Sequence, residues 1–177
     1  PTLILDIDLV EENYLNLKAG MPDAHVHYAV KSNPHPAILQ RLVELGCRFD
    51  AASMGEIEMC LAAGAEPEHI SFGNTVKRWQ DIEYAYRNDI TLFSADAEEE
   101  LEKIARHAPN SRVFIRVLIG QTEAEWPLSR KFGCDPAMAS ITDLKSLAQR
   151  ASQLADYLEK NNIQELEGWV QAKITKS

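Results

Sequence analysis

The first two thirds of the chain alternate short runs of β-branched and aromatic residues with segments of helical periodicity. Such alternation is typical of βαβ units arranged around a parallel sheet. We expect strands at 2–6, 26–30, 47–50, 69–73, 91–94 and 112–118, and helices at 8–19, 36–45, 54–63, 77–87 and 97–107. The sequence therefore predicts an α/β fold with a parallel sheet.

Several helix ends are marked by capping residues. Pro36 stands where the first helical residue tolerates proline, and Ser53 with Glu56 three residues later forms a capping box. Gly46 and Gly64 follow helical segments, where glycine commonly ends a helix.

Lys31 follows the apolar strand at 26–30 and precedes Ser32-Asn33-Pro34, so we expect its ammonium at the rim of the sheet. A lysine held against apolar walls loses its charge more easily than one at the reference pKa of about 10.4. Such an amine can form a Schiff base with an aldehyde, notably pyridoxal phosphate. The alternative is a lysine that only extends into water.

Polar residues follow the other strands at the same predicted edge, where chemistry collects in parallel α/β sheets. Asp50 and Asp96 are candidates for this edge, although each is equally well suited to cap the following helix. Arg116 interrupts an apolar strand, and a charge there needs a partner or a ligand. Lys31, Asp50 and Arg116 together would hold a cofactor aldehyde, its phenolic oxygen and a charged substrate group.

Four ordered motifs carry a resemblance to a known family: YAVKSNP at 28–34, FDAAS at 49–53, ISFGNTVK at 70–77 and WPLSRKFG at 126–133. They resemble the ornithine/lysine/diaminopimelate/arginine decarboxylases, which are fold-type III pyridoxal-phosphate enzymes. The likeness covers about residues 2–139 and is nearest to bacterial ornithine/lysine decarboxylases. Four ordered motifs are a far more specific signal than any one of them.

The resemblance implies an alanine-racemase-like (β/α) barrel of the TIM type, a pyridoxal 5'-phosphate cofactor and decarboxylation of a small cationic amino acid in polyamine biosynthesis. It makes Lys31 the lysine that forms the Schiff base, and Asp50 and Arg116 neighbours of the cofactor. It also places Lys131 near the interface of a homodimer.

The family pattern stops early in this chain. The ring-stacking histidine of the family would fall at Gln171-Ala172, and the glycine-rich phosphate loop cannot be assigned. We therefore predict a partial barrel at 1–139 and a helix plus tail at 140–177 that does not match the family.

Length supports the same division. A complete barrel of this type takes at least about 200 residues, and the chain has 177. We expect a fragment, a truncated relative or an engineered scaffold, with weak activity or none by itself. Leucines and an alanine at three-to-four spacing between 144 and 158 predict a helix that covers the barrel or pairs between subunits.

Composition limits the partners and the location expected for the chain. A net charge of -9 argues against nucleic acid or an anionic membrane as a partner and suits a cationic substrate. No apolar stretch is long enough to span a membrane, we expect no signal peptide, and three scattered cysteines suit a reducing cytoplasm. His25 and His27 share a strand face, but without a third ligand we expect no metal site.

Two other classes of function stay open. One is a noncatalytic relative that binds a regulator, against which the intact Lys31 motif argues. The other is a scaffold without activity, which the unmatched tail favours.

Overall fold

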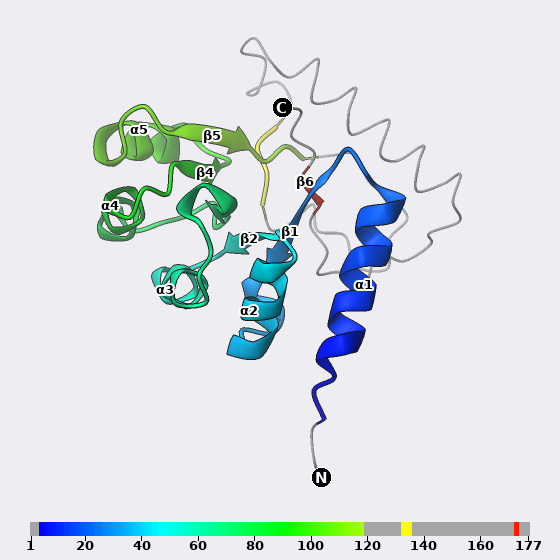
Figure 1. Ribbon diagram of the computed structural model, residues 1–177. Coiled ribbons are helices and arrows are strands. Elements are labelled where there is room, and N and C mark those ends of the chain that lie inside the picture. The colour runs from blue at the N-terminus through cyan, green and yellow to red at the C-terminus, as the bar shows by residue number, and fades with distance from the viewer. Residues whose placement is uncertain (1–3, 119–131, 136–171, 174–177) are drawn as a thin grey trace.

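The computed structural model describes residues 4–118, 132–135 and 172–173 (Figure 1). Its sheet has the strand order β5-β4-β3-β2-β1-β6. The first five strands pair in parallel, and two-residue β6 pairs antiparallel with β1. The bounds are β1 His25–Ala29, β2 Arg48–Ala51, β3 Ile70–Phe72, β4 Leu92–Ala95, β5 Arg112–Ile115 and β6 Ala172–Lys173.

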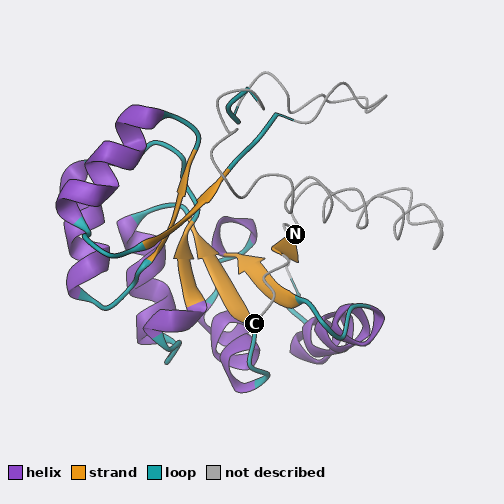
Figure 2. Cartoon of the chain, turned by 90° about the horizontal axis from the view of Figure 1, so that it is seen from above, coloured by secondary structure: helices purple, strands orange, loops and turns teal. Residues whose placement is uncertain are grey.

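Helices alternate with these strands along the chain. They are α1 Ile7–Gly20, α2 Pro36–Glu44, α3 Met54–Ala62, α4 Trp79–Arg87 and α5 Glu98–His107, with 3-10 turns η1 Val30–Ser32 and η2 Pro67–His69. Seen from above, the strands form a curved sheet and the helices follow its outer side (Figure 2). The arrangement confirms the prediction of a parallel-stranded part of an α/β barrel.

The two faces of the sheet differ in chemistry. Successive side chains of a strand point to opposite faces, and on one face the strands carry large apolar residues that belong to the buried core, among them Phe49, Ile70, Phe72 and Phe93. The alternate positions include Asp50 and its register neighbour Ser71. The apolar face packs under the helices, which leaves the polar positions for the concave side.

The expected strand at 2–6 is wrong. The described residues 4–6 form no strand, and α1 begins directly after them. Asp6 is the N-cap of α1, because its carboxylate accepts a hydrogen bond from the amide of Leu9 at 3.1 Å. A short apolar run is a weak strand signal when an aspartate closes it.

The other predicted helix ends are confirmed. Pro36 is the first residue of α2, and the hydroxyl of Ser53 accepts from the Glu56 amide at 3.3 Å at the start of α3. Glu56 reaches back to the amide of Ala52 at 2.7 Å, one residue earlier than in the standard capping box. Gly46 and Gly64 follow α2 and α3 with φ of +73° and +91°, which glycine adopts without strain.

A buried ion cluster joins α5 to the sheet. The Lys77 amine lies 2.9 Å from Glu100 and donates to the carbonyls of Asn74 at 2.8 Å and Ser94 at 2.6 Å. Glu100 also pairs with Lys103 at 2.6 Å. Burial lowers the pKa of Lys77, and the Glu100 carboxylate opposes that shift. Glu100 is 5% exposed, so this acid of the first turn of α5 is buried.

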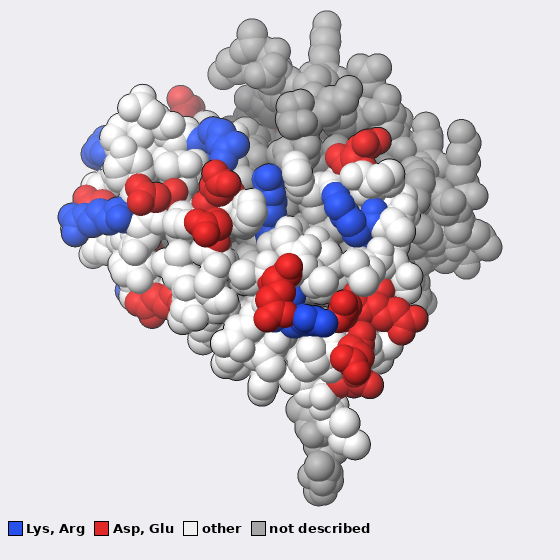
Figure 3. Space-filling view, in the orientation of Figure 1, with Lys and Arg blue, Asp and Glu red and all other residues white. Residues whose placement is uncertain are grey.

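Charged side chains are distributed over the surface. On the face drawn in Figure 3, acidic and basic groups are interspersed on the described residues, without a continuous basic surface. Arg41 of α2, for example, lies between Glu11 of α1 and Glu44. Within the described ranges, no helix is both long and apolar enough to cross a membrane.

Some predictions fall on residues that the structure does not describe. The helix expected between 144 and 158, the Gln171 position and Lys131 lie outside the described residues.

Candidate functional site

Lys31 lies at the carboxyl end of β1, in the 3-10 turn η1. Two hydrogen bonds hold this turn: the Ser32 hydroxyl donates to the Ala29 carbonyl at 2.7 Å, and the Tyr28 hydroxyl donates to the Asn33 carbonyl at 3.0 Å. The Lys31 side chain is exposed. The expectation of a lysine enclosed by apolar walls is therefore wrong for this structure, because the β1 residues turn their apolar side chains under the helices and the chain leaves the sheet at Lys31.

Asp50 lies near the carboxyl end of β2 and is 9% exposed. Its Oδ1 accepts a hydrogen bond from the hydroxyl of Ser71, the facing residue of β3, at 3.0 Å. The capping alternative for Asp50 is wrong, since Ser53 caps the following helix.

Arg116 follows β5, and its amide donates to the Ala95 carbonyl at 2.9 Å, which continues the pairing with β4. Its guanidinium lies over the ring of Phe132, 5.0 Å from the ring centre, a cation–π contact. The charge that interrupts an apolar strand thus has an aromatic partner from a segment far along the chain.

Asp96 contacts the same segment, residues 132–135. Its Oδ2 accepts a hydrogen bond from the Gly133 amide at 3.0 Å, while Ala97, the N-cap of α5, makes no side-chain capping hydrogen bond. Capping by Asp96 is therefore also wrong. The Cys134 amide donates to the Arg116 carbonyl at 2.9 Å, so residues 132–135 extend the carboxyl edge beyond β5.

The three predicted site residues all lie at one edge of the sheet, Lys31 after β1, Asp50 in β2 and Arg116 after β5. The edge thus carries an amine, a carboxylate and a guanidinium on three strands. Among the described residues, no group of three or more metal-ligating side chains is present.

Sequence reasoning missed two neighbours of Asp50. Ser71 is fully buried beside it, and a Cβ on Gly73 would lie 2.0 Å from its Oδ1. The motif at 70–77 contains both residues, and the alternation of side chains along β2 and β3 would have placed Ser71 on the face of Asp50.

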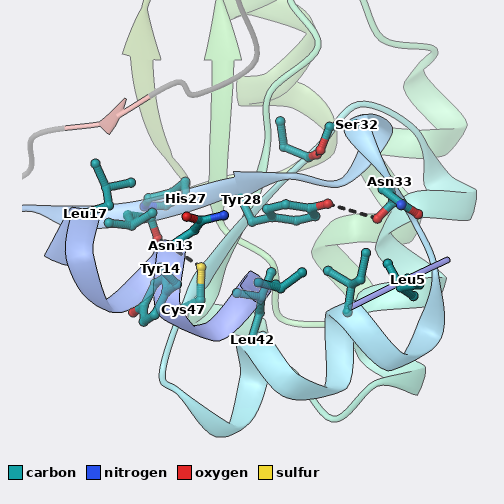
Figure 4. A pocket seen from close by; sticks show the side chains of 14 residues that line it. Leu5, Asn13, Tyr14, Leu17, His27, Tyr28, Ser32, Asn33, Leu42 and Cys47 are labelled. Atoms are coloured by element: carbon teal, nitrogen blue, oxygen red, sulfur yellow. Dashed lines mark hydrogen bonds between the residues drawn. The ribbon is translucent and has the colours of Figure 1, made fainter. Parts of the chain in front are cut away.

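A separate pocket of about 700 Å³ lies between α1, β1 and α2 (Figure 4). Its lining is mostly apolar, with Leu17 and Leu42 among the contributors, and includes no lysine, arginine, aspartate or glutamate. A cofactor phosphate needs cationic or backbone donors. The carboxyl edge, rather than this pocket, is therefore the candidate site.

Comparison with known proteins identifies the class. The family model for the pyridoxal binding domain of pyridoxal-dependent decarboxylases matches residues 7–155. The chain belongs to this family, whose cofactor is pyridoxal phosphate.

Individual relatives agree with this assignment. The chain is 35% identical to a lysine/ornithine decarboxylase of Selenomonas ruminantium over 151 residues, which are 85% of the chain and 38% of that protein. It is 32% identical over 152 residues to antizyme inhibitor 2 of Xenopus laevis, covering 86% of the chain and 32% of that protein. A solved structure of an SrLDC mutant in complex with PLP aligns with a TM-score of 0.72 at 35% identity, covering 82% of this chain and 37% of that one. The chain thus spans about a third of the length of each of these relatives.

The residues at the carboxyl edge fit the cofactor. Lys31 presents an exposed amine, Asp50 is held in place beside Gly73, and Arg116 supplies a cation. An amine, a carboxyl group and a guanidinium suit an aldehyde and the polar groups of a pyridine ring.

Proposed function

We propose that this chain is the pyridoxal-phosphate-binding part of an ornithine/lysine-type decarboxylase, with Lys31 as the amine that joins the cofactor. One observation carries the proposal: Lys31, Asp50 and Arg116 lie at the carboxyl edge of a parallel sheet whose family is the pyridoxal binding domain. Chemistry collects at that edge in α/β barrels.

Each of the three residues has a separate task. The Lys31 amine would hold the cofactor through its aldehyde group. Asp50 holds a polar group of the ring, and Arg116 neutralises negative charge at the same edge. Pyridoxal phosphate, once bound, supplies the electron sink for loss of carbon dioxide from an amino acid.

Borohydride reduction tests this role of Lys31. After incubation with pyridoxal phosphate, reduction and peptide mapping, we expect one stable adduct at Lys31 that is absent from Lys31→Ala. Lys18→Ala is the matched control, because Lys18 donates to the Ala24 carbonyl at 2.6 Å, just before the opposite end of β1. Labelling spread evenly over the lysines would refute the proposal.

The substrate is a small basic amino acid, and the natural assembly is a homodimer in a polyamine-forming reaction. The similarity to a lysine/ornithine decarboxylase supports the substrate class. Carbon dioxide release from ornithine, lysine, arginine and diaminopimelate tests it, with weak or no turnover expected from the chain alone. Sedimentation tests the dimer.

A noncatalytic regulator-binding protein is the second candidate, and the similarity to antizyme inhibitor 2 favours it. A Lys31 adduct without turnover on any of the four amino acids, even when the rest of the barrel is supplied, would decide for this alternative. The cytoplasmic location stays a prediction from the free cysteines.

A further inference from the structure

Two residues of the β3 region enclose the carboxyl group of Asp50. The Ser71 hydroxyl lies 3.0 Å from Asp50 Oδ1 and 3.2 Å from the Phe49 carbonyl. On the next residue of the same strand face, Gly73, a Cβ would stand 2.0 Å from Oδ1 and 2.6 Å from both Cγ and Oδ2. The carboxyl group therefore lies against the bare Cα of Gly73, in space that any side chain would occupy.

The Ser71 hydroxyl is placed to fix the direction of the Asp50 carboxyl group. Its proton has the Phe49 carbonyl and the Asp50 carboxylate within reach. A hydroxyl that donates to Oδ1 from the neighbouring strand holds the carboxyl group in one orientation.

Stability alone does not account for this arrangement. Ser71 is fully buried on a central strand, where an apolar side chain would avoid desolvation of a hydroxyl. Gly73 continues the sheet, since its amide donates to the Ala51 carbonyl at 2.8 Å, yet glycine is unfavourable in strands. A serine at 71 and a glycine at 73 are both explained if they hold the carboxyl group of Asp50 in place.

We propose that Ser71 is a positioning residue that holds the Asp50 carboxyl in one orientation toward the cofactor, and that Gly73 leaves the space for it. The inference rests on the proposed function, because it concerns the same site.

Binding of pyridoxal phosphate, followed by absorption titration, tests the inference on the whole chain. We expect Ser71→Ala to weaken binding about tenfold, the size of one hydrogen bond to a charged group. Gly73→Ala should weaken binding by at least about tenfold because its Cβ displaces the carboxyl group, and both variants should alter the spectrum of the bound cofactor. Ser71→Thr keeps the hydroxyl and should bind like the wild type. Ser111→Ala is the control, because it removes a serine hydroxyl at the other end of the sheet, just before β5.

Urea unfolding of each variant separates folding from positioning, and Ser71→Cys, nearly isosteric but a weak donor, serves if Ser71→Ala does not fold. Equal cofactor affinity and spectrum in the wild type and Ser71→Ala would overturn the inference while the proposed function stands. Equal weakening in Ser71→Thr and Ser71→Ala would also overturn it. A wild-type chain that binds no pyridoxal phosphate would overturn the proposed function, and the inference with it.

Discussion

Two lysines show how differently this sheet uses the same side chain. Lys77 lies in the layer between the sheet and the helices, where its amine meets two carbonyls and the Glu100 carboxylate. Lys31 lies at the open carboxyl edge, exposed, and among the described residues it makes no hydrogen bond or ion pair that holds its amine. The first has every donor occupied, whereas the second is available to a ligand.

The difference separates stability from chemistry. A buried ammonium with three acceptors cannot attack an aldehyde, because its protons and its position are fixed. An exposed amine contributes little to folding and is free to react. We therefore expect substitutions in the helix–sheet layer to change the stability of the fold. Substitutions of Lys31 should instead change the binding of pyridoxal phosphate.

Glu100→Ala should give the largest loss of stability, about 3–5 kcal/mol, because it leaves Lys77 buried without its counter-charge. Urea unfolding followed by circular dichroism measures this change. The control is Glu99→Ala, which removes an exposed acid from the same helix turn and should change stability by less than about 0.5 kcal/mol. Similar small losses in both variants would show that the cluster does not stabilise the layer.

The buried thiols of the same layer should make stability fall at alkaline pH. Burial raises the pKa of Cys47 and Cys60 to about 12 from an ordinary value of 9.0. A raised folded pKa means that this stability is present below pH 9 and is lost as the pH rises toward 12. Between pH 9 and pH 10 we expect about 1 kcal/mol to be lost per thiol.

Comparison with Cys60→Ala isolates one thiol from the other groups that titrate in this range. When the wild type and Cys60→Ala are unfolded at pH 9 and at pH 10, the free energy of unfolding should decline less in the variant. Identical declines would contradict the effect of burial on Cys60.

Helix capping should have a moderate effect at the carboxyl edge. Ser53→Ala removes the hydroxyl that accepts from the Glu56 amide and should destabilise the chain by about 1 kcal/mol. Ala97→Ser is the reciprocal change at the uncapped start of α5, where we expect a gain of up to about 1 kcal/mol. Thermal unfolding measures both, and a loss in Ala97→Ser would mean that the start of α5 cannot accept a capping hydroxyl.

Lys31→Ala should have the smallest effect on stability, within about 0.5 kcal/mol, because the side chain is exposed. The same variant should lose the borohydride-stable adduct entirely. A large loss of stability would erase the contrast with Lys77, since it would show that Lys31 also serves the fold.

The fold was largely predictable because its signals are local. Alternating strand and helix patterns located β1 to β5 and α1 to α5, and Pro36, Ser53 and Gly64 marked helix ends that the structure confirms. The error at 2–6 arose where an apolar run was too short to separate a strand from the approach to a helix.

The candidate site was predictable only in part. The position of Lys31 at the rim followed from its place after an apolar strand, whereas its exposure depended on which way the chain turns at η1. Three contacts of the site join residues that are distant in the sequence. Asp50 and Ser71 are 21 positions apart, Asp96 and Gly133 are 37 apart, and Arg116 and Phe132 are 16 apart. No local pattern reports such pairs.

By itself, the sequence determined the order of the elements, the edge at which the candidate residues lie and the family, because periodicity, caps and ordered motifs are written along the chain. Only the tertiary structure decided which lysine is buried with a carboxylate and which is open to a ligand. It also decided that Asp50 packs against Gly73, which directly follows the neighbouring strand β3. These outcomes depend on strand register and helix packing, which bring distant residues within hydrogen-bonding distance.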